Sequence, residues 1–156
     1  MKVLWHYIKW LLLPLGIGHL LVVWLRNKFY DKNIITKQQL PRPVISVGNV
    51  QMGGTGKTPL VLALIELLQA NGKTVAVLTR GYKRKSQEDI IATSEQLEFS
   101  QKQIGDEPAI ILSNLQNGVL GVGANRYDVG KKILAAHPVD IFILDDGFQY
   151  RKLHRE

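Results

Sequence analysis

One short run of residues combines closely spaced glycines with a cation and a hydroxyl: Gly53, Gly54, Thr55, Gly56, Lys57 and Thr58. It lies shortly after the apolar stretch 44–48. Glycines allow backbone amides to converge on an anion without Cβ clashes, a lysine can reach β and γ phosphates, and a threonine hydroxyl can complete a Mg²⁺ shell. The run therefore predicts a phosphate-binding loop that binds ATP or GTP together with Mg²⁺.

The run departs from the usual phosphate-loop pattern at two positions. Gln51 stands where the pattern has its first glycine, and the preceding glycine is Gly48. A related group of ATPases carries a lysine just before the first glycine of the run, but this chain has Met52 there. A flexible turn with an incidental Lys-Thr is the alternative, and the order of strand, loop and helix argues against it.

A second acidic element follows the apolar stretch 139–144, which ends in Asp145, Asp146 and Gly147. In open α/β sheets, ligands bind beyond the carboxyl ends of the strands. A carboxylate in that place can hold Mg²⁺ directly or through water. We therefore predict that Asp145 and Asp146 share a metal site with Thr58.

The elements that must position these residues alternate between strand and helix from residue 43 onward. This alternation predicts an α/β fold of the P-loop NTPase type, with a doubly wound, mostly parallel sheet. The expected strands are 44–48, 75–78, 90–92, 119–122 and 139–144, and the expected helices are 58–70, 105–115 and 127–136. We assign residues 43–156 to this nucleotide-binding domain.

Charge divides the chain of 156 residues unevenly, because residues 1–42 hold seven basic side chains and one acidic one. Of the net charge of +7, this segment carries +6 and the remainder +1. The bases flank an apolar stretch instead of lining a polar face, which favours an anionic membrane surface and argues against nucleic acid as a partner. The chain has no cysteine, so disulfides and thiolate chemistry are excluded.

The apolar stretch 10–25 has no formal charge but contains Pro14, Gly16 and Gly18. Its length is below the roughly 20 apolar residues of a spanning helix, so we predict a kinked or interfacial helix. We assign residues 1–30 to a membrane-associating leader and 31–42 to a linker. A secretory signal peptide and a soluble core helix are the alternatives, and the first lacks a small-x-small cleavage site.

Five motifs in order resemble the tetraacyldisaccharide 4′-kinase family, which phosphorylates the lipid A precursor in Gram-negative bacteria. They are G-N-V-x-x-G-G-T-G-K-T-P (48–59), T-R-G-Y (79–82), G-D-E-P (105–108), A-N-R (124–126) and D-D-G-F-Q (145–149). The resemblance implies transfer of phosphate from ATP to the 4′-hydroxyl of a tetraacylated glucosamine disaccharide 1-phosphate. It also implies a peripheral or monotopic location at the cytoplasmic face of the bacterial inner membrane.

The resemblance also implies roles for individual residues. Asp106 matches the aspartate that serves as the base, whereas its position alone favours helix capping. Lys57 is expected to act in catalysis as well as in phosphate binding. The positions matched to the lipid headgroup or its phosphate are Arg80, Tyr82, Asn125, Arg126 and Gln149.

Two departures from the family pattern affect these expectations. The family reads D-D-G-F-Q-H, whereas this chain has Tyr150 in place of the histidine. The chain also ends at Glu156, about half the family's length, so the family's second domain is missing from the sequence. We expect an N-terminal fragment, a split gene product or a truncated frame, with reduced or no activity alone unless a C-terminal half is supplied separately.

A membrane-tethered nucleotide-dependent switch or partitioning-type ATPase is the rival class of function. A GTPase switch calls for N-K-x-D after the metal aspartate, but the chain has only N-R-Y-D at 125–128, before Asp145. A partitioning ATPase calls for lysine at the place of Met52. Both features are missing, which favours the kinase.

Overall fold

The computed structural model describes residues 2–49, 56–81, 88–96 and 101–155. Its contacts divide the chain into two compact units, Met1–Lys37 and Gln38–Glu156. The first unit is built on helix α1 (Lys2–Asp31), a continuous helix with Pro14 inside it. The second unit begins inside the segment expected to be a linker, because Leu40 is buried in its core.

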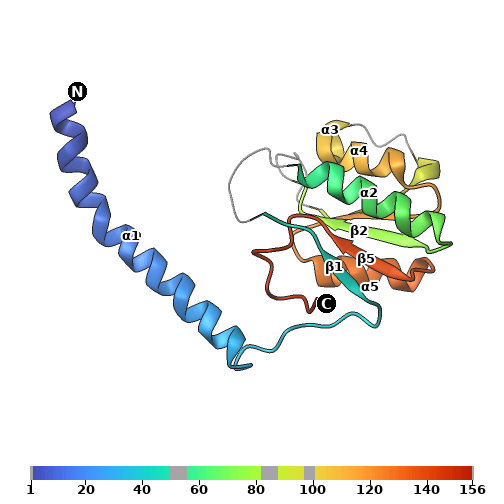
Figure 1. Cartoon of the computed structure of the whole chain (residues 1–156), viewed down its shortest axis with the longest axis horizontal. Helices are drawn as coiled ribbons and strands as arrows, with labels where there is room; N and C mark the ends of the chain where they lie inside the picture. The colour runs from blue at the N-terminus through green and yellow to red at the C-terminus, as the bar shows by residue number, and fades with distance from the viewer. Residues whose placement is uncertain (1, 50–55, 82–87, 97–100, 156) are drawn as a thin grey trace. The chain divides into compact units, whose positions relative to one another are not determined.

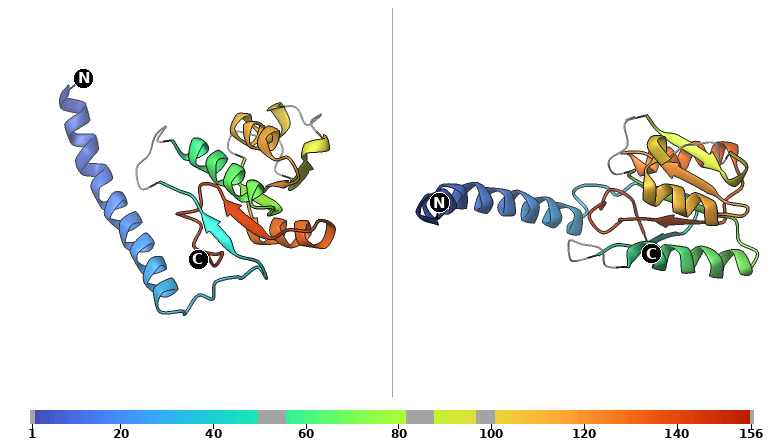
Figure 2. Two further views of the ribbon diagram at one scale, coloured as in Figure 1. Left: turned by 45° about the vertical axis from the view of Figure 1, so that its right-hand side comes forward. Right: turned by 90° about the horizontal axis from the view of Figure 1, so that it is seen from above.

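The second unit is a five-stranded, mostly parallel sheet between two layers of helices (Figures 1 and 2). Its strands are β1 (Val44–Ser46), β2 (Val75–Thr79), β3 (Ile90–Thr93), β4 (Val119–Val122) and β5 (Ile141–Leu144). They lie in the order β1-β5-β2-β4-β3, and β3 alone among them runs antiparallel, against β4. The prediction of a mixed α/β fold with a mostly parallel sheet is confirmed.

Helices α2 (Lys57–Ala70), α3 (Gln101–Ile104) and α4 (Asp106–Asn114) cover one face of the sheet, and α5 (Arg126–Ala136) covers the other (Figure 2). A short 3₁₀ turn, η1 (Ser94–Gln96), follows β3. Side chains of β2 alternate between the two layers: Val75 and Val77 join the core under α2 and α4, whereas Ala76 and Leu78 join the core under α5. This two-residue period is what a strand buried on both faces requires.

Local sequence explains where helix α2 ends. Gly72 has a φ of 70°, and its amide donates to the carbonyl of Gln69 while the amide of Lys73 donates to that of Leu68. This pair of bonds is the Schellman motif, which favours glycine at the left-handed position. The Asn71 side chain adds a bond of 2.7 Å to the Leu67 carbonyl. The chain then turns directly into β2.

Candidate active site

The candidate site lies where β2 and β5 end and helix α2 begins. Because β1, β2, β4 and β5 are parallel, their carboxyl ends meet at one edge of the sheet. Gly56, with a φ of 76°, is the N-cap of α2, and Lys57 is the first residue of that helix. The helix therefore points its positive end toward this edge, where anions bind favourably.

Lys57 reaches across the edge to the acidic turn after β5. Its Nζ lies 2.9 Å from Oδ1 of Asp146, although the two residues are 89 positions apart in the sequence. This ion pair raises the pKa of Lys57, and Asp145 and Glu107 add to the effect. The two sequence features predicted to form one site are thus in direct contact.

Asp145 is the buried member of the acidic turn, with 7% of its surface exposed. Oδ2 of its carboxylate accepts a hydrogen bond of 3.1 Å from the hydroxyl of Thr79 at the end of β2. Burial raises the pKa of Asp145, and the neighbouring Glu107 and Asp146 add to this shift. A carboxylate held in a buried, acidic place is stabilised when a divalent cation binds to it.

The geometry of the acidic turn depends on close packing by two glycines. Asp146 has a φ of 51°, an uncommon value for a residue with a side chain. A Cβ on Gly147 would collide with the hydroxyl of Ser46 and with Leu144. A Cβ on Gly48 would lie 2.5 Å from the Phe148 ring and 2.8 Å from its amide nitrogen. The turn is thus pressed against the end of β1.

Arg155 holds the same turn from the C-terminal side. Its guanidinium donates to the carbonyl of Gly147, to the hydroxyl of Ser46 at 3.2 Å and to the carbonyl of Phe148 at 3.2 Å. The segment that carries Arg155 is itself fixed by a bridge between Gln38 and Leu153, and Leu153 is buried. Sequence reasoning did not identify Arg155, and a single surface-type arginine offered no pattern by which to find it.

Helix α4 also begins at this edge, because Glu107 is close enough to raise the pKa of both Lys57 and Asp145. Asp106 is the exposed first residue of α4, and the N-cap is Gly105. Gly105 therefore occupies the N-cap position without a side-chain capping bond, and Asp106 lies in the first turn, where the helix dipole favours an acid.

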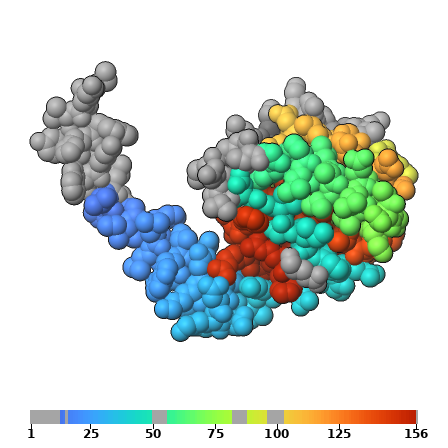
Figure 3. Space-filling model, viewed as in Figure 1, coloured from blue at the N-terminus to red at the C-terminus, as the bar shows by residue number. Residues whose placement is uncertain are grey.

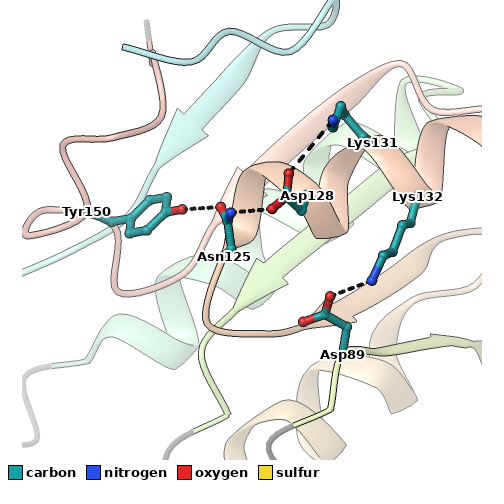
Figure 4. Close-up of polar contacts among 6 residues, drawn as sticks. All are labelled: Asp89, Asn125, Asp128, Lys131, Lys132 and Tyr150. Carbon is teal, nitrogen blue, oxygen red and sulfur yellow. Dashed lines mark hydrogen bonds and ion pairs between the residues drawn. The ribbon is translucent and has the colours of Figure 1, made fainter. Parts of the chain in front are cut away.

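The start of helix α5 contributes Asn125, which is its N-cap, and Arg126, which is its first residue, and both are predicted to bind substrate. Arg126 is only 7% exposed, and burial lowers its pKa while Asp145 and Asp146 act in the opposite direction. Its guanidinium lies 4.4 Å from the centre of the Tyr150 ring. Asn125 accepts a hydrogen bond of 2.9 Å from the Tyr150 hydroxyl and donates to Asp128 (Figure 4).

The remaining predicted residues are placed as follows. Thr58 lies in the first turn of α2, Arg80 is exposed directly after β2, and Gln149 is exposed in the segment after the acidic turn. In the described part of the chain, no group of three or more His, Cys, Asp or Glu side chains is arranged so that it could hold a metal ion by itself. Four predicted residues lie outside the described residues: Gly53, Gly54, Thr55 and Tyr82.

Comparison with known proteins decides the family. The tetraacyldisaccharide-1-P 4′-kinase family matches residues 8–156. The chain belongs to this family. A tetraacyldisaccharide 4′-kinase of Aquifex aeolicus is 42% identical over 146 residues, which are 93% of this chain and 46% of that protein. One of Geobacter metallireducens is 40% identical over 148 residues, covering 94% and 44%.

A solved structure of the family agrees with this fold. The crystal structure described as the "apo" form of LpxK from Aquifex aeolicus in complex with ATP superposes with a TM-score of 0.83 at 42% identity. The match covers 92% of this chain and 45% of the other. The chain thus spans somewhat less than half the length of the tetraacyldisaccharide 4′-kinases that it matches.

Proposed function

We propose that this chain forms the nucleotide-binding half of a tetraacyldisaccharide 4′-kinase, with a nucleotide site of the P-loop type. The reaction would move the γ-phosphoryl group of ATP to the 4′-hydroxyl of a tetraacylated disaccharide 1-phosphate. The contact between Lys57 and Asp146 carries the proposal, because it joins the start of α2 to the acidic turn. The ATP complex of the Aquifex aeolicus relative supports the choice of nucleotide. The switch and partitioning classes are not favoured by the family match.

The residues present fit Mg·ATP. Thr58 and Asp145 offer hard oxygen donors, and Asp145 is a buried carboxylate whose charge is disfavoured without a cation. Mg²⁺ sites of this kind use one or two protein ligands and complete the shell with phosphate oxygens and water. When bound, the ion would neutralise charge on the transferring phosphate. Asp146 is assigned to support the same metal, and Lys57 to the phosphates.

Asp106 is the proposed base for the acceptor hydroxyl. Its exposed position at the start of α4 leaves it accessible to a substrate, and its neighbour Glu107 lies within electrostatic range of Lys57 and Asp145. Phosphoryl transfer depends mostly on positioning and charge neutralisation, with a carboxylate to accept the hydroxyl proton. Arg80, Arg126 and Gln149 are assigned to the acceptor or its phosphate.

A chimaeric enzyme tests this proposal. This chain would replace the matching part of the Aquifex aeolicus enzyme, and transfer from radiolabelled ATP to a purified acceptor would be measured. We expect transfer that falls about 10²- to 10⁴-fold in an Asp106→Asn variant, the range of general-base catalysis. Glu66→Gln, at an exposed acid near the middle of helix α2, is the control and should retain activity. Equal rates for Asp106→Asn and the unsubstituted chimaera would contradict the assignment of the base.

We propose that helix α1 associates with the membrane and that the protein lies at the cytoplasmic face of the bacterial inner membrane, as a peripheral or monotopic protein. Its described side chains expose many large apolar groups: Leu13, Ile17, Leu20, Leu21, Val22, Trp24, Leu25 and Phe29. They lie in the blue segment of Figure 3. None of the described helices is both long enough and apolar enough to cross a membrane. Exposed apolar groups among basic residues suit an anionic lipid surface.

A further inference from the structure

Tyr150 makes two separate contacts with the start of helix α5. Its hydroxyl donates to Oδ1 of Asn125 at 2.9 Å, and its ring faces the guanidinium of Arg126 at 4.4 Å (Figure 4 shows the first contact). The ring also packs against the core under helix α5. The Tyr150 side chain is therefore held in place, and it connects the segment after the acidic turn to the start of α5.

Asn125 serves mainly as a connector in this arrangement. Its oxygen accepts from Tyr150, and its amide nitrogen donates to Oδ2 of Asp128. Asp128 in turn lies 3.8 Å from Nζ of Lys131 (Figure 4). Both ends of the Asn125 amide are thus engaged by side chains of the protein, and the turn before α5 is fixed.

Arg126 differs from Asn125 in having donor capacity left over. Nη1 donates to the carbonyl of Ala124 at 3.1 Å, but the buried Nε has no partner among the described residues. The guanidinium is close enough to Asp145, Asp146 and Arg80 for each to affect its pKa, so it belongs to the same edge of the sheet. A buried donor without a partner costs free energy that a bound acceptor would recover.

We propose that Tyr150 is a positioning residue for Arg126. Its ring fixes the plane of the Arg126 guanidinium, and its hydroxyl fixes the turn at Asn125. Arg126 is thereby held so that its free donor can bind a phosphate group. The proposal rests on the proposed function, which brings phosphate-bearing ligands to this edge. A planar guanidinium binds phosphate best when its orientation is set in advance. The phosphate belongs either to the nucleotide or to the sugar phosphate of the acceptor.

Substitutions at Tyr150 and Arg126 separate the two contacts. Tyr150→Phe keeps the ring and removes the hydroxyl, whereas Tyr150→Leu removes both. Arg126→Lys keeps the charge and removes the plane that the ring supports. Affinities for Mg·ATP and for glucosamine 1-phosphate would be measured by calorimetry on each variant of the full chain. Thermal unfolding would establish that each variant is folded. If Tyr150→Leu is not folded, Tyr150→Met replaces it as a second variant without an aromatic ring.

We expect Tyr150→Leu to weaken binding of one of the two probes by about 2- to 30-fold, the range of cation–π contacts from exposed to desolvated sites. Tyr150→Phe should weaken binding of the same probe by a smaller factor. In the Arg126→Lys background the Tyr150→Leu change should have little further effect, because Tyr150 acts through Arg126. The probe that responds identifies the source of the phosphate.

Two results would overturn the proposal. One is a folded Tyr150→Leu or Tyr150→Met variant that binds both probes as the unsubstituted chain does. The other is a Tyr150 effect that adds fully to that of Arg126→Lys, which would mean that Tyr150 supports the fold in general. Lys57→Ala is included as a reference for the nucleotide site. If this variant bound Mg·ATP normally, the proposed nucleotide site would be contradicted. The affinity for glucosamine 1-phosphate alone would then decide the Tyr150 proposal.

Discussion

Asp145 is the residue at which the stability of the fold and the proposed chemistry conflict most directly. Its carboxylate lies at the end of a buried strand, and burial raises its pKa. A carboxyl whose pKa is higher in the folded state than in the unfolded state stabilises the fold below its unfolded pKa. That contribution is lost as pH rises through the folded pKa. At neutral pH the ligand-free protein therefore holds an unfavourable charge that a bound cation would offset.

Replacing Asp145 by asparagine should therefore stabilise the ligand-free protein at pH 7. The amide is neutral and can still accept the hydrogen bond from Thr79. We expect a gain of about 0.5–2 kcal/mol in the free energy of unfolding, measured by urea titration, together with loss of Mg²⁺-dependent nucleotide binding. The gain should shrink as the pH falls through the raised pKa of Asp145, because the aspartate then becomes neutral as well. A variant less stable than the unsubstituted chain at pH 7 would contradict this account.

The acidic turn after β5 is the element on which the site depends, because it brings together residues of β1, β2, α2 and the C-terminal segment. Gly147 packs against Ser46 of β1, and Arg155 bonds to the carbonyls of Gly147 and Phe148. An L side chain at Gly147 would have to displace Ser46 and Leu144, both of which belong to adjacent strands. The placement of Asp145 and Asp146 is thus set by close backbone packing.

Gly147→Ala should destabilise the nucleotide-binding unit by about 1–3 kcal/mol, the usual cost of overpacking. Thermal unfolding followed by circular dichroism would measure the change. Gly18→Ala is the matched control, because a Cβ at this position of helix α1 meets nothing within 4 Å. Alanine also favours a helix over glycine. Equal destabilisation by the two changes, or none by Gly147→Ala, would show that the packing of this turn is not limiting.

Much of the element pattern could be predicted from the sequence, because buried parallel strands appear as short apolar runs between helices. Helix 58–70 forms as Lys57–Ala70, and strand 119–122 forms as predicted. Strand 44–48 is shorter than predicted, because it ends at Ser46. Strand 139–144 begins only at Ile141. The ends of a strand depend on contacts with distant segments, and a local sequence pattern does not contain those contacts.

The strand order and the supporting residues of the site could not be predicted. The antiparallel pairing of β3 with β4 and the contact of Thr79 with Asp145 join residues far apart in the sequence. Short apolar runs do not specify their neighbours, which tertiary packing selects. The glycines, the lysine and the aspartates were identifiable because their chemistry restricts the residue types. The contacts of Arg155 and Tyr150 use residue types that occur on any surface.

At the scale of the whole molecule, the chain combines two units with different surfaces. Helix α1 exposes large apolar side chains along its described length, whereas the second unit buries its apolar residues in two layers around the sheet. Basic residues accompany the apolar helix, so attraction to an anionic surface and apolar insertion can act together. Both would serve the reaction proposed above, whose acceptor is acylated.

Replacing Leu20 and Leu21 together by glutamate should release the protein from anionic liposomes. Each inserted leucine contributes about 1.5–3 kcal/mol, so we expect a loss of at least about 100-fold in partitioning measured by co-sedimentation. Leu67→Glu on helix α2, also an exposed leucine, is the control and should leave partitioning nearly unchanged. Unchanged binding by the double variant would mean that α1 does not enter the lipid surface.

The central claim is that Lys57 and the acidic turn form one nucleotide site, and calorimetric titration of the full chain with Mg·ATP tests it most directly. Lys57→Ala should weaken binding about 10- to 150-fold, the loss expected for a charge-assisted hydrogen bond. It should change stability by less than about 1 kcal/mol, because its partner Asp146 is largely exposed and an ion pair open to solvent contributes little. Lys73→Ala, at the turn after helix α2, is the control and should bind as the unsubstituted chain does. Equal affinity for Mg·ATP in the unsubstituted chain and in Lys57→Ala would contradict the account.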